Sequence, residues 1–311
     1  MMKRLGCLIA ALATVGLAGA ASADIAKLPP KVVAGIAALG PVLNPDMIAK
    51  TNALIGPLAP TTPPASVTVA KDVAYGADPL QKLDVYSPKG ARNLPIAVFV
   101  HGGGFVRGDK KDYDNVPTYL SQHGIVAVNA DYRLAPKVTW PAATQDVGAM
   151  VAFLKANAAR YGGDPNRIVL IGHSAGANSV ASYVLDSSLH PASGPGVVAA
   201  VLVSLPASRR ESIGQRDSAY FGDDASLYAQ RAPATHVNES KLPLLLVTAQ
   251  YDPVELAPDA YDLAAKICLR DKQCPLFLYV NGHNHISEVG SIGTKDDQLA
   301  RPLAAFVRAA R

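Results

Sequence analysis

Short apolar runs alternate with longer amphipathic or alanine-rich stretches along most of the 311-residue chain. A continuous run of apolar and β-branched residues indicates a strand buried on both faces, whereas apolar–polar alternation indicates a strand at a sheet edge. The alternating type comes first, as a predicted strand pair at residues 67–75 and 82–86. Predicted buried strands follow at residues 95–100, 124–130, 167–171, 197–204, 242–249 and 276–280.

Stretches of helical composition separate these runs. We expect helices at residues 113–123, 141–161, 177–185, 257–269 and 296–308. Strands that alternate with helices form a mostly parallel sheet with helices on both faces. The sequence therefore predicts an α/β fold whose mostly parallel central sheet is flanked by helices, with ligands bound beyond the carboxyl ends of the strands.

Two segments break this rhythm. Residues 24–66 are rich in proline and contain two possible short helices, at 31–39 and 45–55. We interpret this segment as an N-terminal arm or partial lid, with a disordered linker as the alternative. Residues 205–241 are polar and longer than a simple connection, which predicts a cap-like insertion that supplies substrate contacts.

The first 23 residues have the pattern of a signal peptide. Lys3 and Arg4 precede an apolar stretch, and Ala-Ser-Ala at residues 21–23 is a cleavage sequence. We expect cleavage before Asp24 and export to the periplasm or the medium, with the catalytic domain spanning residues 67–311. The alternative is an uncleaved anchor, although the apolar run is short for a membrane span.

Charge and cysteine content narrow the function classes. Without Lys3 and Arg4 the net charge falls from +4 to +2, too little to indicate nucleic-acid binding. Cys268 and Cys274 are the two cysteines that remain after cleavage, and in an oxidising compartment they are a possible disulfide. Closing this small loop would stabilise the fold by roughly 2 kcal/mol; two free thiols are the alternative. Without nearby histidines, the pair does not indicate a zinc site.

The sequence Gly-His-Ser-Ala-Gly at residues 172–176 lies between a predicted buried strand and a predicted helix. This context is that of a nucleophile elbow, in which a tight turn raises the serine hydroxyl above the sheet. We therefore interpret Ser174 as a nucleophile, the alternative being an inert serine in a strand-to-helix turn. Three successive glycines at 102–104 also follow a predicted strand, and their backbone N–H groups suit a developing oxyanion.

A serine nucleophile needs a histidine base and a carboxylate that orients it. Asp252 is the best candidate acid because it lies just past a predicted strand, whereas Glu255 and Asp259 suit the start of the next helix. His283 and His285 both follow the last predicted strand, and the residue pattern alone leaves the choice of base open. The order serine, aspartate, histidine is that of the α/β hydrolases.

The other histidines of the predicted site suggest structural roles. His101 starts the glycine run and is expected to brace it, and His173 within the elbow is expected to pack or form a structural hydrogen bond. We also interpret the run that begins at Asp131 as a support for this region, through an ion pair between Asp131 and Arg133.

Three motifs together carry a family resemblance. His-Gly-Gly-Gly-Phe at 101–105, Asp-Tyr-Arg-Leu-Ala-Pro at 131–136 and Gly-His-Ser-Ala-Gly at 172–176 resemble the hormone-sensitive-lipase-like and related bacterial carboxylesterases of the α/β-hydrolase superfamily. The resemblance covers about residue 67 to the C-terminus. Where the lipase-like members usually have aspartate, the elbow has His173, which is closer to the feruloyl-esterase-like and kynurenine-formamidase-like sub-branch.

This resemblance implies an α/β-hydrolase fold and a serine mechanism without cofactor or metal. It implies that the backbone N–H groups of Gly103, Gly104 and Ala175 form the oxyanion hole, and it places the base at His285. The expected function is hydrolysis of short-chain or aromatic acyl esters of small molecules through an acyl-enzyme on Ser174. An amidase or formamidase with the same triad is the alternative, and a non-catalytic binding module is the alternative of another class. We expect no nucleic-acid partner and no stable membrane insertion after cleavage.

Overall fold

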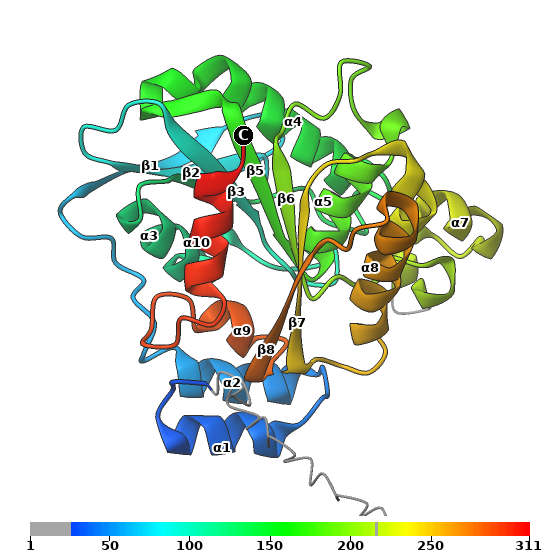
Figure 1. Ribbon diagram of the computed structural model, residues 1–311, viewed down its shortest axis with the longest axis horizontal. Helices are drawn as coiled ribbons and strands as arrows, with labels where there is room; N and C mark the ends of the chain where they lie inside the picture. Colours follow the sequence, from blue (N-terminus) through cyan, green and yellow to red (C-terminus); the bar gives the residue numbers. More distant parts are fainter. Residues whose placement is uncertain (1–25, 215–216) are drawn as a thin grey trace, which may run out of the picture.

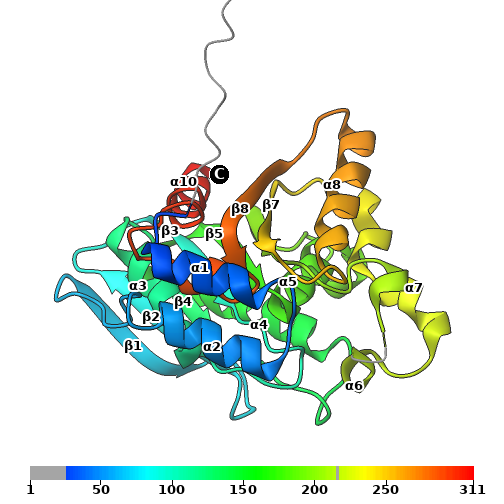
Figure 2. The ribbon, with the colours of Figure 1, turned by 90° about the horizontal axis from the view of Figure 1, so that it is seen from below.

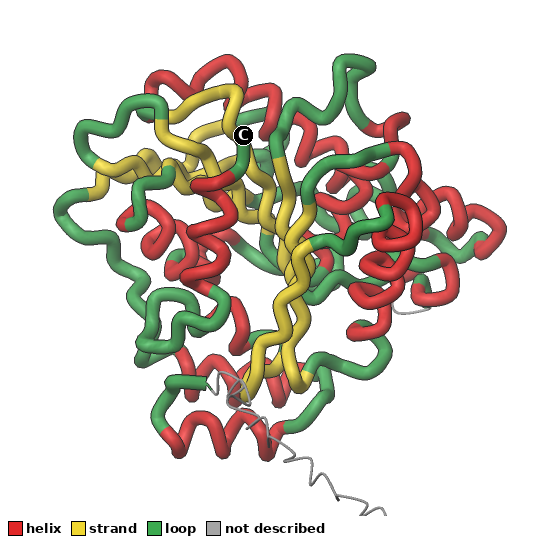
Figure 3. The backbone as a smooth tube through the Cα atoms, viewed as in Figure 1, coloured by secondary structure: helices red, strands yellow, loops and turns green. Residues whose placement is uncertain are grey.

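The computed structural model describes residues 26–214 and 217–311, so the predicted signal peptide lies outside the described residues. Within them, a single eight-stranded sheet runs in the order β1-β2-β4-β3-β5-β6-β7-β8 (Figures 1 and 3). The strands are β1 (Val67–Ala74), β2 (Lys82–Pro88), β3 (Leu94–Val100), β4 (Val126–Ala130), β5 (Gly163–His173), β6 (Ala199–Val203), β7 (Leu244–Tyr251) and β8 (Leu276–Asn284).

Strand direction matches the prediction of a mostly parallel sheet. β2 is antiparallel to both of its neighbours, β1 and β4, and β1 lies at the edge. All other neighbouring strands, from β4 through β8, are parallel. The carboxyl ends of β3, β5, β7 and β8 therefore meet at one edge, because parallel neighbours end on the same side.

Helices cover both faces of the sheet. Along β3, Ile96 and Val98 belong to one hydrophobic core with residues of α4, α5 and α8, whereas Ala97 and Phe99 belong to a second core with residues of α3 and α10. This alternation is the two-residue period of a strand buried on both sides. The helices that cover the faces are α3 (Asn115–Gln122), α4 (Ala142–Asn157), α5 (Ala175–Leu185), α8 (Ala257–Asp271) and α10 (Ala300–Ala309).

The N-terminal arm folds as two helices, α1 (Pro30–Leu39) and α2 (Pro45–Ile55), at the positions the sequence predicts. α2 begins with an N-cap, since the Asn44 side chain accepts a hydrogen bond from the Met47 N–H at 2.8 Å. Both helices lie beside the lower ends of β7 and β8 in Figure 1, and Figure 2 shows them across the front of the sheet. The linker alternative is therefore wrong for the described part of the arm.

Buried contacts fix this arm to the sheet. Val32, Ile36 and Ile55 form a small apolar cluster, against which Tyr251 at the end of β7 packs. At the end of β8, the buried Asn284 amide donates a hydrogen bond of 2.9 Å to the Thr51 hydroxyl. The arm therefore covers the edge of the sheet where the functional strand ends meet.

The insertion between β6 and β7 is a series of short helical turns, described apart from residues 215–216. Its Tyr220 ring stacks on Phe105 at 4.5 Å between centroids, and Phe221 meets the same ring edge-on at 5.2 Å. The insertion thus supports the glycine run after β3. The short helices here are η4 (Arg210–Ser212), α6 (Ser218–Phe221), η6 (Ala225–Leu227), α7 (Tyr228–Arg231) and η7 (Pro233–Glu239).

The remaining short helices are η1 (Lys110–Tyr113), η2 (Ala158–Tyr161), η3 (Ser187–Leu189) and α9 (Ser287–Gly290). β8 continues four residues past the predicted end at residue 280, because a register shift after Ala249 lets Tyr251 pair with Asn284. The sulfur atoms of Cys268 and Cys274 lie 2.13 Å apart; their oxidation in the protein stays a prediction. In the described residues, no helix has the length and apolar character needed to cross a membrane.

Candidate active site

Ser174 occupies a strained turn between β5 and α5. Its backbone has φ 53° and ψ −125°, a conformation that residues other than glycine rarely adopt and that is found at functional sites. The flanking glycines permit this turn: a Cβ on Gly172 would lie 2.4 Å from the Gly176 oxygen, and one on Gly176 would lie 2.2 Å from the Val100 oxygen. The strand–turn–helix context predicted from the motif is therefore present.

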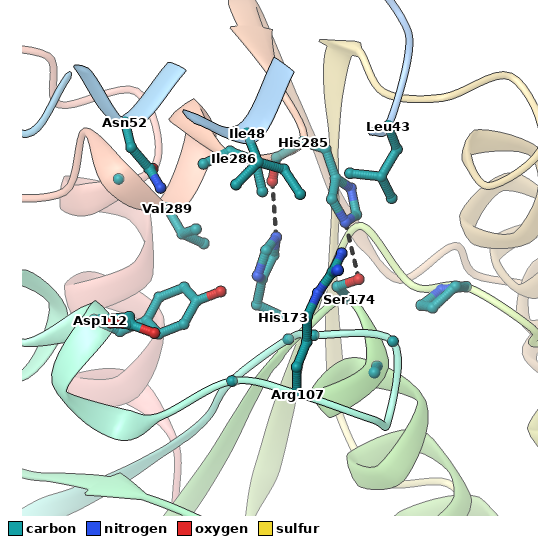
Figure 4. A pocket seen from close by; sticks show the side chains of 18 of the residues that line it. Leu43, Ile48, Asn52, Arg107, Asp112, His173, Ser174, His285, Ile286 and Val289 are labelled. Atoms are coloured by element: carbon teal, nitrogen blue, oxygen red, sulfur yellow. Dashed lines mark hydrogen bonds between the residues drawn. The ribbon is translucent and has the colours of Figure 1, made fainter. Parts of the chain in front are cut away.

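The structure brings Ser174, His285 and Asp252 together, each directly after the end of a parallel strand. The Ser174 Oγ lies 2.9 Å from His285 Nε2, and His285 Nδ1 lies 2.9 Å from Asp252 Oδ1 (Figure 4 shows the first of these contacts). All three residues are buried. Of the two histidines that the sequence leaves open, His285 is the one at the serine.

His283 points elsewhere. Its Nε2 lies 3.0 Å from Asp296 Oδ2 and its Nδ1 lies 3.1 Å from the Ser287 hydroxyl, so it ties the end of β8 to the following segments. In a continuous strand, residues 283 and 285 would lie on the same face. They differ because β8 ends at Asn284 and the chain leaves the strand before His285.

The hydrogen bonds around Asp252 define the proton positions. Burial alone would raise the pKa of Asp252, but hydrogen bonds from His285, Ser204 and the Ala249 N–H hold it below its usual range. An ionised carboxylate only accepts, so His285 Nδ1 carries the hydrogen. In the neutral imidazole, Nε2 is then left to accept the hydrogen bond from the Ser174 hydroxyl, as a general base requires.

The glycine run after β3 passes alongside the serine. A Cβ on Gly102 would lie 2.9 Å from the Cβ of Ser174, and one on Gly103, whose φ is 133°, would lie 1.9 Å from the Arg107 oxygen. Gly104 also has a positive φ, of 61°. Gly103, Gly104 and Ala175 line the same cavity as Ser174. Ala175 is the first residue of α5, where the helix dipole favours negative charge.

His101 and its neighbours hold this run in place. The Tyr132 hydroxyl donates a hydrogen bond of 3.0 Å to the His101 oxygen, and the two rings stack at 4.5 Å. Asp131 lies 3.5 Å from His101 Nε2 and accepts a 2.6 Å hydrogen bond from the Lys110 N–H. The prediction that His101 braces the loop is confirmed.

The predicted ion pair between Asp131 and Arg133 is wrong. The Arg133 guanidinium instead pairs with Asp146 of α4, at 2.7 Å from Nη2 to Oδ1, and the Arg133 N–H donates to the same carboxylate at 2.8 Å. Asp146 is fully buried and needs a cation. Asp131 already accepts from the Lys110 backbone, so it supports the site through that contact.

His173 forms the structural hydrogen bond expected of it. Its Nε2 donates to the backbone oxygen of His285 at 2.8 Å, so the elbow holds the backbone of the histidine that contacts Ser174 (Figure 4). Burial, together with the neighbouring His285, lowers the pKa of His173 to about 3. The ring therefore stays neutral at physiological pH.

A cavity of about 660 Å³ opens beside Ser174. The arm contributes Leu43 and Ile48 to its wall, and the chain after His285 contributes Ile286 and Val289 (Figure 4). The exposed Arg107 side chain rises from the glycine-run side toward Ser174 and His285 in the same view.

The insertion at residues 205–241, predicted to supply substrate contacts, contributes only a small part of the cavity wall. Among its described residues, Pro206 and Asp217 line the cavity, whereas the arm supplies seven of the lining residues. The reason is topological: the insertion packs along α5 and behind Phe105, while α1 and α2 lie across the carboxyl edge. The cavity wall therefore comes mainly from the segment interpreted as an arm or partial lid, and only to a small extent from the insertion.

Sequence reasoning also missed Ser204 and Glu288. The Ser204 hydroxyl lies 2.5 Å from Asp252 Oδ2 and is hydrogen-bonded to Glu288 Oε1 as well. Ser204 directly follows β6 and Glu288 comes three residues after His285, both at the functional edge. Position after a strand end is the signal that would have singled out Ser204.

Two groups of side chains in the described residues have the spacing of metal ligands. In each, the potential ligand atoms lie within 4.8 Å of one another: His173, His285 and Glu288 in the first, and Asp186, His236 and Glu239 in the second. Hydrogen bonds already occupy the ring nitrogens of His285 and His236. We assign no metal to either group.

Part of the chain is similar to known proteins. Residues 83–187 match the family model BD-FAE, a span that includes the glycine run and the elbow but neither Asp252 nor His285. The chain is 33% identical over 133 residues to isoprenylcysteine alpha-carbonyl methylesterase ICME of Arabidopsis thaliana, covering 42% of this chain and 31% of that protein. It is 34% identical over 154 residues to esterase LipC of Mycobacterium tuberculosis, covering 46% of this chain and 37% of that protein. The alignments thus span about a third of the length of these relatives.

A solved arylesterase structure superimposes with a TM-score of 0.66 at 23% identity, covering 91% of this chain and 98% of that one. The sheet order, the elbow and this likeness show that the chain has the α/β-hydrolase fold. Over the aligned part, its sequence is similar to proteins named as esterases, in line with the hormone-sensitive-lipase-like resemblance of its motifs.

The neutral His173 generates a prediction about stability. In the unfolded chain a histidine takes up a proton near pH 6.5, whereas folded His173 does so only near pH 3, so protonation favours the unfolded state as the pH falls through this window. Between pH 7 and pH 5 this group should cost about 2 kcal/mol of unfolding free energy. His173→Gln keeps a donor for the His285 oxygen but has no imidazole to protonate. Between pH 7 and pH 5 we expect its free energy of unfolding to fall by about 2 kcal/mol less than that of the wild type.

Denaturant unfolding at the two pH values measures this difference. His123→Gln, at an exposed histidine, is the matched control and should follow the wild type. An equal loss in the wild type and in His173→Gln would contradict a neutral buried His173.

Proposed function

We propose that this protein is a serine carboxylesterase that hydrolyses short-chain or aromatic acyl esters of small molecules. The observation that carries the proposal is the continuous hydrogen-bonded chain Ser174–His285–Asp252 at a cavity bordered by the glycine run. The names of the relatives and of the arylesterase neighbour support ester bonds as the substrate class.

The proposed reaction begins with a proton transfer to His285. His285 Nε2 takes the proton of Ser174 as Oγ attacks the ester carbonyl carbon, and Asp252 stabilises the imidazolium that forms. The carbonyl oxygen becomes an oxyanion facing the N–H groups of Gly103, Gly104 and Ala175, and each such donor contributes on the order of 3 kcal/mol to the transition state.

The second half of the reaction uses the same groups in reverse. The imidazolium of His285 returns its proton to the leaving alkoxide, which departs as the alcohol and leaves an acyl-enzyme on Ser174. Water then attacks the acyl carbon while His285 accepts its proton. Release of the carboxylic acid gives the proton back to the Ser174 oxygen, so the enzyme is unchanged.

We expect Ser174→Ala to lower kcat on a short p-nitrophenyl ester by at least about a thousandfold, because the nucleophile is removed. A fluorophosphonate probe should label the wild type at Ser174 and leave the variant unlabelled. Ser182→Ala removes a buried serine of α5, the helix that follows Ser174, and is the matched control, which should keep both turnover and labelling.

Turnover by Ser174→Ala equal to that of the wild type would contradict the serine mechanism. An N-formyl amide in the same assay separates the two hydrolase alternatives, since faster turnover of the amide would favour a formamidase. A folded wild type that the probe does not label would favour the binding module.

We further propose that the N-terminal arm sets the size of the acyl group. Ile48 lies on the cavity side of α2, whereas its neighbour Ala49 is exposed. Ile48→Trp fills part of the cavity and should lower kcat/KM on a hexanoyl or benzoyl ester by about tenfold relative to an acetyl ester. Ala49→Trp adds the same ring on the outer face and should leave that ratio unchanged. Equal ratios in both variants would place the acyl group away from the arm.

We also propose export. Cleavage after residue 23 should give a periplasmic protein that begins at Asp24 when the full chain is expressed in a Gram-negative host. N-terminal sequencing checks this, and thiol titration of the unfolded, unreduced mature protein should detect neither Cys268 nor Cys274. A cytoplasmic product that keeps residues 1–23 would contradict export.

A further inference from the structure

The hydroxyl of Ser204 lies between two carboxyl groups. On one side it meets Asp252 Oδ2 at 2.5 Å, and on the other it contacts Glu288 Oε1. All three side chains are buried. A serine hydroxyl has one hydrogen, so it donates to one carboxyl group and must accept from the other. One of the two carboxyl groups therefore carries a proton.

The surrounding donors decide which carboxyl group that is. Asp252 Oδ2 also accepts from the Thr248 hydroxyl at 2.8 Å and from the Ala249 N–H at 2.9 Å, while Oδ1 faces His285 Nδ1. These are the surroundings of a carboxylate anion. Glu288 has only Ser204 as a hydrogen-bond partner of its carboxyl group, and its buried Oε2 has none among the described residues.

We propose that Glu288 is a neutral carboxylic acid that donates its proton to Ser204, so that Ser204 in turn donates to Asp252. This two-step donor chain lies behind the His285–Asp252 pair. Its role in positioning Asp252 for catalysis rests on the function proposed above. Glu288 and Ser204 would be positioning residues: they fix the second oxygen of Asp252 without adding a second negative charge to the site.

The charges around Glu288 favour the neutral form. Burial and the nearby Asp252 raise the pKa of Glu288 well above its usual range. His173 Nε2 lies 3.8 Å from Oε1, but it already donates to the His285 oxygen and its ring is neutral. His285 is also close, since ligand atoms of His173, His285 and Glu288 lie within 4.8 Å of one another.

The elements packed on the outside of α9 bring no charge to it. Ile55 of α2 packs against Gly290, and the Asn115 amide of α3 donates to the Val289 oxygen at 2.9 Å. The charged residues of α2, Asp46 and Lys50, are exposed and pair with each other at 2.8 Å. Glu288 thus has no cation in the described residues that would stabilise its ionised form.

The backbone of Ser204 supports a specific role for its hydroxyl. Its φ of 48° lies in the left-handed region, which a serine adopts at a cost of about 1–3 kcal/mol. The Ser204 N–H donates to the Val247 oxygen at 2.9 Å, which keeps the residue in line with the end of β7. Ser174, the proposed nucleophile, has the same kind of backbone strain after its own strand.

Infrared difference spectroscopy tests the protonation state of Glu288 directly. We expect the wild type at neutral pH to show the C=O stretching band of a buried protonated carboxylic acid, and Glu288→Gln to lack this band. Glu255→Gln changes an exposed glutamate near Asp252 and is the matched control that should keep it. Spectra in which the wild type and Glu288→Gln do not differ in this region would overturn the proposal.

Kinetics test the positioning role. Ser204→Ala and Glu288→Ala should lower kcat by about tenfold or more with little change in KM, because Asp252 and hence His285 are less well held. Glu288→Gln keeps a neutral donor and should regain most of the kcat that Glu288→Ala loses. The acid limb of its kcat/KM profile should coincide with that of the wild type, since no charge has been removed.

A shift of this acid limb to lower pH by about one unit or more in Glu288→Gln would mean that a negative charge had been removed near His285, and would overturn the proposal. The proposal would also be overturned if Glu288→Gln were no more active than Glu288→Ala while thermal unfolding showed both variants to be folded. The infrared result does not depend on activity. An unlabelled Ser174 would end the proposed function, while the protonation of Glu288 would still be measured.

Discussion

The hydrogen bond between Ser174 Oγ and His285 Nε2 joins two residues that are 111 positions apart, at a distance of 2.9 Å. It forms because β5 and β8 run parallel and end at the same edge, and because β7 between β6 and β8 brings Asp252 to the other side of the imidazole. Each partner sits directly after a strand. The chemistry proposed for the protein depends on this shared edge more than on any local sequence.

Holding these polar groups in a buried site is costly unless each has a partner. An unpaired buried donor or acceptor costs about 1–3 kcal/mol, and an unpaired charge costs more. In this site Asp252 has such partners, because its carboxylate accepts hydrogen bonds from His285, Thr248 and Ser204. Further out, apolar packing of the arm against Tyr251 covers the same edge.

The sequence predicts much of this arrangement, and the physical reason is visible in particular residues. The strands are local apolar patterns, and Ser174 and Asp252 stand out as polar residues directly after them. His285 and His283 are both of the right type in the right place, and only the turn of the chain after Asn284 separates their roles. The match to the BD-FAE family ends at residue 187, so it gives no help with that choice.

What the sequence does not predict are pairings chosen by tertiary packing. Arg133 pairs with Asp146, a buried carboxylate with no other ion pair in the described residues, and the sequence around Asp131 does not indicate this pairing. Ser204 and Glu288 are 84 positions apart in the sequence and meet only in the fold. The protonation proposed for Glu288 depends on the other donors that contact Asp252. The proline-rich segment suggests an arm or partial lid, but the place where α1 and α2 dock on the sheet edge is not encoded in either helix alone.

A crystal structure of the protein after reaction with a phosphonate ester tests the central claim most directly, since the tetrahedral phosphorus mimics the proposed intermediate. The account predicts phosphorus bonded to Ser174 Oγ, a phosphonyl oxygen within hydrogen-bond distance of the Gly103, Gly104 and Ala175 nitrogens, and His285 beside the leaving-group oxygen. Phosphorus bonded to another residue, or an adduct whose oxygen faces away from these three nitrogens, would contradict it.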